Sequence, residues 1–308
     1  MKVVQQVLDI FQHYRMRPTS IDQYEQVGRE VLGNKISSFI SNGERIEFVM
    51  LGYPMKSPNE RDKVIGSIPD LGEQLSVENF KNFSDAVSTV YPHGISINLV
   101  SDGYVFSDIM KTSDITVAGY EEVMKDMIRI APIKWYNAKD FYSNKLSVNN
   151  VREKIVQQFG VTPLILEQRI LTDPDVNFLY RGMIKFLEVD LAAYPYSSSN
   201  SLHKDAKRVA REMMFRNEAY SQLIREEFKD CIRLSMHPSI NNGTKYSFQL
   251  IPSPKAWTSP WHSAIAMDPY IEGNERYETI HRKDAVAGKY QLEFKNGKPY
   301  YFTKILTS

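Results

Sequence analysis

This chain has little cysteine, almost no net charge and no long apolar run. Its 308 residues include a single cysteine and carry a formal net charge of +1. One cysteine excludes an internal disulfide and a cysteine-based zinc site, and the near-neutral balance gives no long-range field that would recruit nucleic acid or an anionic membrane. No segment reaches the ~20 apolar residues of a membrane-spanning helix, and the N-terminus lacks the apolar core of a signal peptide. We therefore expect a cytoplasmic protein with no nucleic-acid or membrane partner.

Sequence periodicity divides the chain into four segments. They are a helical segment at about 1–44, a strand–helix–strand unit at about 45–110, a helical segment at about 111–229 and a β-rich end at 230–308. The length suffices for one large core, and no internal repeat marks a boundary. We predict a single α/β domain over 1–308, with a mixed, partly parallel central sheet, flanking helices and a Rossmann-like βαβ core.

The βαβ unit fixes where polar residues meet. Residues 46–51 are almost entirely apolar, as expected of a strand covered on both faces, and 95–100 read as its parallel neighbour. The connection between them crosses over right-handed. The residues that follow the two strands, 56–63 and Asp102, are therefore expected at the same end of the sheet.

Local signals predict where elements begin and turn. Ser76 is the expected N-cap of the helix inside the βαβ unit, and Gly33 the expected end of an N-terminal helix. Asp102-Gly103 has hairpin character and predicts a returning strand over 104–109. Asn296-Gly297 predicts another hairpin near the C-terminus.

The loop after the first strand is rich in cations, hydroxyls and amides. Lysine offers a point charge and arginine a bidentate fork, which suit phosphate or carboxylate. The alternative is a solvated surface loop. The candidate binding residues are Lys56, Ser57, Asn59, Arg61 and Lys63.

Three further sets of polar residues fall at strand ends. Asp102 and Asp108 form a carboxylate pair suited to proton transfer if burial raises one pKa, or else a turn. Arg233, Ser235 and His237 alternate along 232–238 and so share one face, which lines a pocket or faces solvent. His262 opens the strand that follows, as a proton-transfer group or as a residue at the edge of the core.

Cofactor signals are weak. Two histidines with Asp102 or Asp108 would make a two-histidine, one-carboxylate metal site, but no tight ligand spacing supports it. The chain also has no GxGxxG, Walker-type loop or GxSxG elbow. These absences argue against a metal site, a nucleotide cofactor and an α/β-hydrolase.

Ordered motifs between about 45 and 270 resemble one known family, the isonitrile synthases of pyoverdine/dityrosine biosynthesis. They are MLGYPMKSPNERDKVIGSIPDLGE (50–73), YPHGISINLVSDGYVFSDI (91–109), RVAREMMFRNEAYS (208–221), IRLSMHP (232–238) and SPWHSA (259–264).

The resemblance implies a catalytic domain that acts on small molecules. Enzymes of this family convert the amino group of tyrosine or tryptophan to an isonitrile with ribulose 5-phosphate as carbon donor, and without a cofactor. We expect L-tyrosine as the substrate, because spare polar side chains near the motifs suit a phenol. Tryptophan, formation of an N-formyl amino acid, and a non-catalytic binding module stay open as alternatives, as does a homodimer.

The resemblance also suggests roles for the candidate residues. Phosphate would bind Lys56, Ser57, Arg61 and Lys63, and protons would move through His237, His262, Asp102 and Asp108. Arg233 would hold the amino-acid carboxylate. Lys56 has a second expected role, a Schiff base with the sugar ketone.

Overall fold

Two β-sheets and a set of packed helices make up the computed structural model, which describes residues 2–143 and 145–305. The first sheet has the order β3-β2-β1-β4-β5, and all its pairs are parallel. The second has the order β7-β6-β9-β8 with mixed pairing. The strands are β1 Ile46–Leu51, β2 Ile95–Ser101, β3 Ile133–Asn137, β4 Ile232–Ser235, β5 Tyr246–Ser247, β6 Ala264–Met267, β7 Tyr277–Ile280, β8 Tyr290–Lys295 and β9 Lys298–Lys304.

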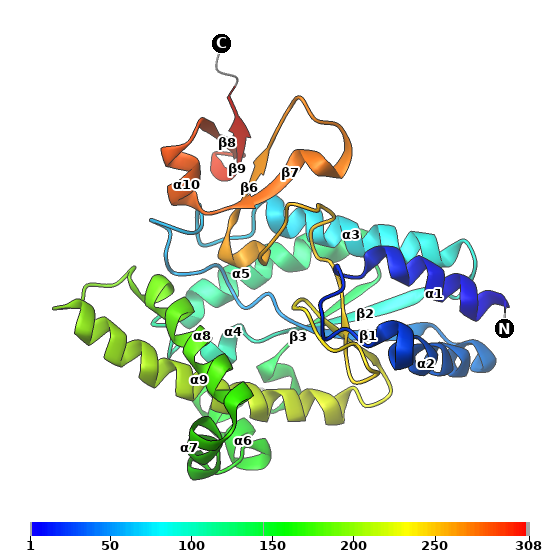
Figure 1. Cartoon of the computed structure of the whole chain (residues 1–308), viewed down its shortest axis with the longest axis horizontal. Helices are drawn as coiled ribbons and strands as arrows, with labels where there is room; N and C mark the ends of the chain where they lie inside the picture. Colours follow the sequence, from blue (N-terminus) through cyan, green and yellow to red (C-terminus); the bar gives the residue numbers. More distant parts are fainter. Residues whose placement is uncertain (1, 144, 306–308) are drawn as a thin grey trace.

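Helices cover both faces of the first sheet (Figure 1). On one face, α1 and α3 pack aromatic rings against β1. The centre of the Phe48 ring lies 6.4 Å from that of Phe11 and 5.5 Å from that of Phe83. On the other, α9 lies against the sheet with α6 and α8 packed on it. The helices are α1 Lys2–Tyr14, α2 Arg29–Asn42, α3 Leu71–Ser88, α4 Gly103–Phe106, α5 Asp114–Met127, α6 Val148–Phe159, α7 Pro163–Thr172, α8 Pro174–Leu191, α9 Ser199–Glu227 and α10 Arg282–Ala287.

Burial explains the parallel pairing. Every residue of β2 is buried, and so are four of the six residues of β1, as expected of strands covered on both faces. β2 lies on one side of β1, whereas β4 lies on the other. The strand order therefore reverses between β1 and β4, and in open α/β sheets ligands bind outside the carboxyl ends of the strands at such a point.

The second sheet packs over α3, near the C-terminus (Figure 1). Leu71 and Leu75 of α3 share a small apolar cluster with Ile265 of β6 and Tyr277 of β7. Between the sheets, a short 3₁₀ helix spans Pro260–His262. The second sheet therefore fixes the chain just beyond His262. Across residues 2–143 and 145–305, no helix has both the length and the apolar character needed to cross a bilayer.

The predicted α/β class and the βαβ core are confirmed, and the mixed pairing is confined to the second sheet. The C-terminal hairpin is also confirmed, with Asn296 and Gly297 at positive φ. The returning strand over 104–109 is wrong. Gly103–Phe106 form α4 instead, because a helical turn buries Tyr104, Val105 and Phe106 together.

Two predicted helix boundaries are wrong for local reasons. Asp70, not Ser76, caps α3, because it accepts a hydrogen bond from the backbone N–H of Gly72 while the Glu73 carboxylate accepts from its own N–H. This capping box uses two backbone donors that would otherwise be unpaired. α2 continues past Gly33 to Asn42, where Gly43 takes the left-handed conformation.

Gly103 allows the loop after β1 to lie against the start of α4. A β-carbon added there would be 2.2 Å from the carbonyl oxygen of Pro54 and 2.8 Å from Val117. Since the first obstacle is backbone, a side chain would push apart the segments that follow β1 and β2.

We therefore expect Gly103→Ala to lower the free energy of unfolding by about 1–3 kcal/mol, the usual cost of overpacking. Gly119→Ala in α5 is the matched control, since nothing lies within 4 Å of the added β-carbon and alanine favours a helix by up to about 1 kcal/mol. Urea unfolding of both variants measures this. A Gly103→Ala variant as stable as Gly119→Ala would contradict it.

Candidate active site

The segments after β1, β2 and β4 meet at the carboxyl edge of the parallel sheet. Tyr53, just beyond β1, is fully buried and has φ 55°, a strained conformation for a bulky residue. Its hydroxyl donates to the Ser76 hydroxyl at 2.8 Å, and its ring lies 4.8 Å from that of Trp261. The loop after β1 is thus held against both α3 and the Pro260–His262 helix.

Lys56 is buried between two carboxylates. Its ammonium lies 2.7 Å from Asp70 and 2.8 Å from Glu73, and it donates to the Pro260 carbonyl oxygen at 2.9 Å. Burial alone would lower the pKa of Lys56, but Asp70 and Glu73 raise it. Burial raises the pKa of Asp70 to about 7, against the opposing effect of Lys56. These contacts keep Lys56 protonated and occupied by protein acceptors.

Lys63 and Ser57 are bound to α8. The ammonium of Lys63 lies 2.6 Å from the Asp190 carboxylate and 4.0 Å from the centre of the Phe186 ring. The Ser57 hydroxyl donates to the same carboxylate oxygen at 2.5 Å, and the Ser57 N–H donates to the Trp261 carbonyl oxygen at 2.8 Å. The loop thus bridges α8 and the segment before His262.

The other two loop candidates take different positions. Asn59 is buried, and its amide donates to the Val189 carbonyl oxygen at 2.6 Å. Arg61 points to solvent, with 70% of its side chain exposed, and pairs with Asp62. The structure therefore brings Lys56, Ser57 and Lys63 near His262 but leaves Arg61 outside.

His262 is held in an environment that favours its neutral form. Burial lowers its pKa well below the ordinary value, and the charges of Lys63, His237 and Lys56 lower it further. The Phe186 ring lies edge-on at 4.7 Å. The Nδ1 atom of His262 is buried and has no hydrogen-bond partner in the described chain. A neutral imidazole with a free nitrogen suits proton transfer.

His237 lies two residues beyond the end of β4. The Ser235 hydroxyl donates to its carbonyl oxygen and accepts from its N–H, which orders the chain there. Solvent reaches His237, yet the surrounding atoms and then Lys245 lower its pKa.

The structure separates the two predicted carboxylates. Asp102 follows β2, and its Oδ1 is buried without a hydrogen-bond partner in the described residues; burial raises its pKa to about 7. Asp108 pairs with Arg216 at 2.7 Å and with Arg152 at 3.4 Å. Burial alone would raise the pKa of Asp108, but Arg216 and then Arg152 lower it. Of the two, Asp102 is therefore the unpaired carboxylate with a pKa near neutrality, whereas Asp108 links α6 and α9 through Arg152 and Arg216.

Arg233 extends from β4 toward α9, where it donates to the Ser221 hydroxyl at 3.1 Å. Sequence reasoning missed its neighbour Lys245, and also Asp190, which binds two loop residues. Neither stands in a recognisable pattern. The Asp70–Glu73 capping box does carry the Asp-x-x-Glu spacing of a helix start and was therefore detectable.

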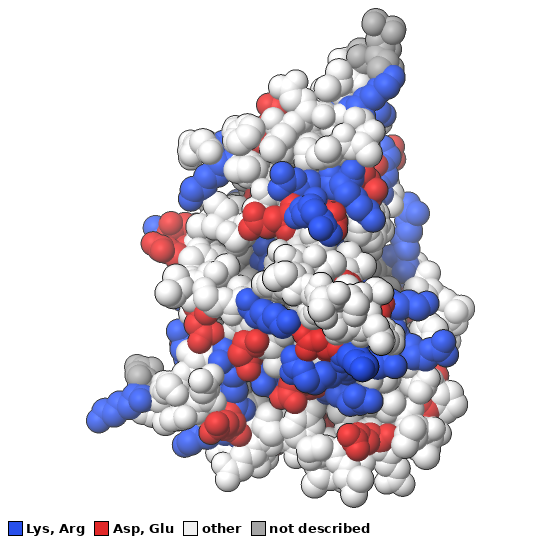
Figure 2. Space-filling model, turned by 90° about the vertical axis from the view of Figure 1, so that its left-hand side faces the viewer, with Lys and Arg blue, Asp and Glu red and all other residues white. Residues whose placement is uncertain are grey.

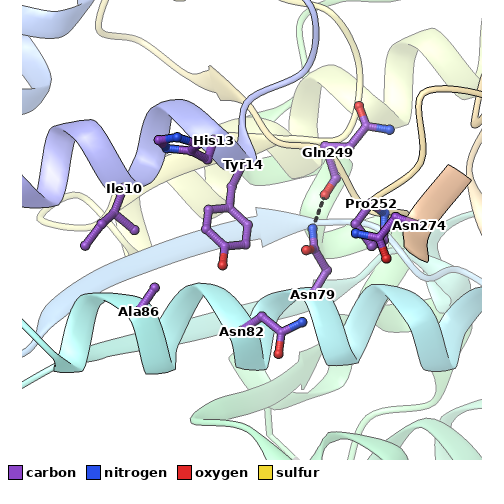
Figure 3. Close-up of a pocket in the computed structure, with 9 residues that line it drawn as sticks. All are labelled: Ile10, His13, Tyr14, Asn79, Asn82, Ala86, Gln249, Pro252 and Asn274. Atoms are coloured by element: carbon purple, nitrogen blue, oxygen red, sulfur yellow. Dashed lines mark hydrogen bonds between the residues drawn. The ribbon is translucent and has the colours of Figure 1, made fainter. Parts of the chain in front are cut away.

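Two open hollows lie apart from these residues. One, of about 430 Å³, lies between α1 and α3, and Figure 3 shows the Asn79 amide donating to the Gln249 carbonyl oxygen at its edge. The other, of about 590 Å³, lies at the junction of α7 and α8. Neither contains a candidate carboxylate or histidine. The carboxyl edge of the first sheet, with Asp102, His237 and His262, is the better candidate for chemistry.

Residues 2–143 and 145–305 contain no set of side chains arranged to bind a metal ion. No three His, Cys, Asp or Glu side chains gather there as a metal site would require. What the edge does offer is a buried carboxylate with a pKa near neutrality, a neutral imidazole and several cations. The carboxylate and the imidazole suit acid–base chemistry.

Known proteins resemble the chain over most of its length. An L-tryptophan isonitrile synthase of Fischerella ambigua, AmbI2, is 29% identical over 87% of this chain and 80% of its own. An L-tyrosine isonitrile synthase of Pseudomonas aeruginosa is 26% identical over 98% and 93%. The isocyanide synthase xanB of Aspergillus fumigatus is 32% identical over 85% of this chain but 37% of its own.

A solved structure agrees with the fold. The crystal structure of PvcA from Pseudomonas aeruginosa superposes with a TM-score of 0.89 at 26% identity, covering 98% of this chain and 100% of PvcA. Residues 36–293 match the family model described as pyoverdine/dityrosine biosynthesis protein. The chain therefore belongs to the pyoverdine/dityrosine biosynthesis family and is a homologue of its isonitrile synthases.

Proposed function

We propose that this chain converts the α-amino group of L-tyrosine to an isonitrile, with ribulose 5-phosphate as the source of the isonitrile carbon. The observation that carries the proposal is that a carboxylate and an imidazole, Asp102 and His262, lie at the carboxyl edge of the parallel sheet, each with one buried atom that has no hydrogen-bond partner in the described residues. Relatives named as tyrosine and tryptophan isonitrile synthases support the reaction class.

The proposed chemistry needs repeated proton transfers. The amine adds to the ketone carbon of the sugar and water leaves; proton transfers, loss of phosphate and carbon–carbon cleavage then leave one carbon on nitrogen. Neutral His262 accepts a proton at its free nitrogen. Asp102, with a pKa of about 7, is available both as an acid and as a base near neutral pH.

The reaction is tested by incubating the purified protein with L-tyrosine and ribulose 5-phosphate, with and without a chelator. We expect mass spectrometry to show the isonitrile in both samples. An N-formyl product, or none, would contradict the proposal. Loss of product on chelation with recovery on adding one metal would show that the chemistry is not purely acid–base.

Asp102→Asn should reduce kcat about 10²–10⁴-fold, the usual effect of losing a general acid–base. It should also stabilise the protein at alkaline pH. Because the folded pKa of about 7 lies above the ordinary 3.8, wild-type stability falls as the pH rises from about 4 through 7. Asparagine does not ionise, so we expect the variant to be more stable by roughly 1–3 kcal/mol at pH 8 and similar to wild type near pH 4.

Asp108→Asn is the control for Asp102→Asn. Its carboxylate pairs with Arg216, so its loss should lower stability at pH 8. Urea unfolding at the two pH values, together with turnover, separates the variants. Normal turnover by Asp102→Asn, or a stability below that of wild type at pH 8, would show that Asp102 only forms a turn and takes no part in proton transfer.

The amino-acid substrate is tested by competition, because the tryptophan-specific relatives are as similar to this chain as the tyrosine-specific ones. We expect tyrosine to be consumed before tryptophan and phenylalanine when all three are present at equal concentration. A site that binds a phenol through hydrogen bonds rejects phenylalanine, which would leave its polar groups unpaired. Faster consumption of tryptophan, or equal use of phenylalanine, would overturn the choice of tyrosine.

A further inference from the structure

Two cations stand side by side at the edge of the first sheet. Strands β4 and β5 are parallel, with Leu234 opposite Tyr246 and Ser235 opposite Ser247. The preceding residues, Arg233 and Lys245, continue this register. Since paired residues in a sheet project to the same face, both side chains lie on the face that α9 covers, where Arg233 reaches Ser221.

These cations have no acidic partner in the described chain. No carboxylate lies within 4.0 Å of Arg233, Lys245 or Arg225 in residues 2–143 and 145–305, and the one hydrogen-bond partner of the Arg233 guanidinium there is the Ser221 hydroxyl. Burial and then Arg225 lower the pKa of Arg233, while burial and then Arg233 lower the pKa of Lys245. Like charges held close together destabilise the fold unless a counter-ion lies between them.

Cations elsewhere near the candidate active site are already neutralised. Lys56 and Lys63 have buried carboxylate partners, and Arg216 pairs with the exposed carboxylate of Asp108. Among the exposed charges, Lys and Arg lie beside Asp and Glu over the face drawn in Figure 2. The Arg233–Lys245 pair is different because Arg233 is half-buried and neither cation has a carboxylate within 4.0 Å in the described residues. This is the arrangement expected of a site whose counter-ion is a ligand.

Two chains of neighbouring residues link the Arg233–Lys245 pair to His262 and to Asp102. Lys245 lowers the pKa of His237, and His237 lowers that of His262, so cations and imidazoles continue from the sheet edge to the loop after β1. On α9, Tyr220 lies next to Ser221 and its hydroxyl donates to the carbonyl oxygen of Ser101, directly before Asp102. In the sheet, Arg233 stands opposite Val49, and Val49 stands opposite Asn98, four residues before Asp102. An anion bound at the pair would therefore lie on the α9 face of the sheet, on the amino-terminal side of the edge that carries Asp102.

We propose that Arg233, Lys245 and His237 bind the phosphate group of the sugar-phosphate substrate. A phosphate dianion suits one guanidinium fork and a neighbouring ammonium better than a carboxylate with a single charge. The sugar chain then extends from this end toward Asp102 and His262. The identity of the sugar rests on the proposed function, but the phosphate site does not. It places phosphate away from the 56–63 loop, whose buried lysines are already paired.

Binding without turnover tests the site. Isothermal titration with inorganic phosphate, ribulose 5-phosphate and tyrosine, each alone, is compared for wild type, Lys245→Gln and Arg233→Gln. We expect each variant to weaken both phosphate ligands about tenfold or more, with tyrosine affinity unchanged. Lys154→Gln is the matched control, because Lys154 is exposed on α6. Arg61→Gln tests whether the 56–63 loop binds phosphate. Both should bind like wild type, and circular dichroism checks that each variant is folded.

Several outcomes decide between the sites. Unchanged phosphate affinity in folded Lys245→Gln, or a loss for Arg61→Gln instead, would overturn the proposal. Weaker tyrosine binding with normal phosphate binding would make the pair a carboxylate site and also overturn it. If phosphate affinity depends on Arg233 and Lys245 but ribulose 5-phosphate yields no isonitrile, the phosphate site stands and the proposed function fails.

Discussion

The ammonium of Lys56 holds three separate segments together where water does not reach. It belongs to the loop after β1, its carboxylate partners begin α3, and its third acceptor is the carbonyl oxygen of Pro260. Removing one member of a buried ionic group is strongly destabilising, because the remaining charge stays buried without compensation. Burial, and then the nearby Glu73 carboxylate, raise the pKa of Asp70 to about 7, while Lys56 opposes the rise. The position of the loop relative to α3 depends on this group.

The orientation of His262 follows from the same group. Lys56 holds the carbonyl oxygen of Pro260, and the N–H of Ser57 holds that of Trp261, so the two residues before the imidazole are fixed by consecutive loop residues. β6 fixes the chain on the other side from Ala264 onward. A catalytic imidazole must lie within a fraction of an ångström of its working position. Lys56 and the Ser57 N–H therefore position the imidazole in this structure, through contacts with backbone oxygens.

Sequence periodicity was sufficient for the central βαβ unit because its strands are buried on both faces. The limits predicted for β1 match the structure, and β2 gains only Ser101. β3 was missed because its five residues, Ile133–Asn137, mix apolar and polar side chains at the sheet edge. β5 is short, Tyr246–Ser247, although Phe248 and Leu250 just beyond it are also buried in the core. Apolar residues thus predicted burial better than strand pairing.

Sequence spacing could indicate which residues are polar at strand ends, but not which of them are already paired. Lys56 and Lys63 read as free cations because their partners Asp70 and Asp190 lie 14 and 127 residues away. Asp108 read like Asp102, although Arg216, 108 residues away, neutralises it. Lys245 drew no attention, because its position beside Arg233 exists only through β4–β5 register. Long-range pairing decides whether a charged side chain supports the fold or is left for a ligand, and that property belongs to the tertiary structure.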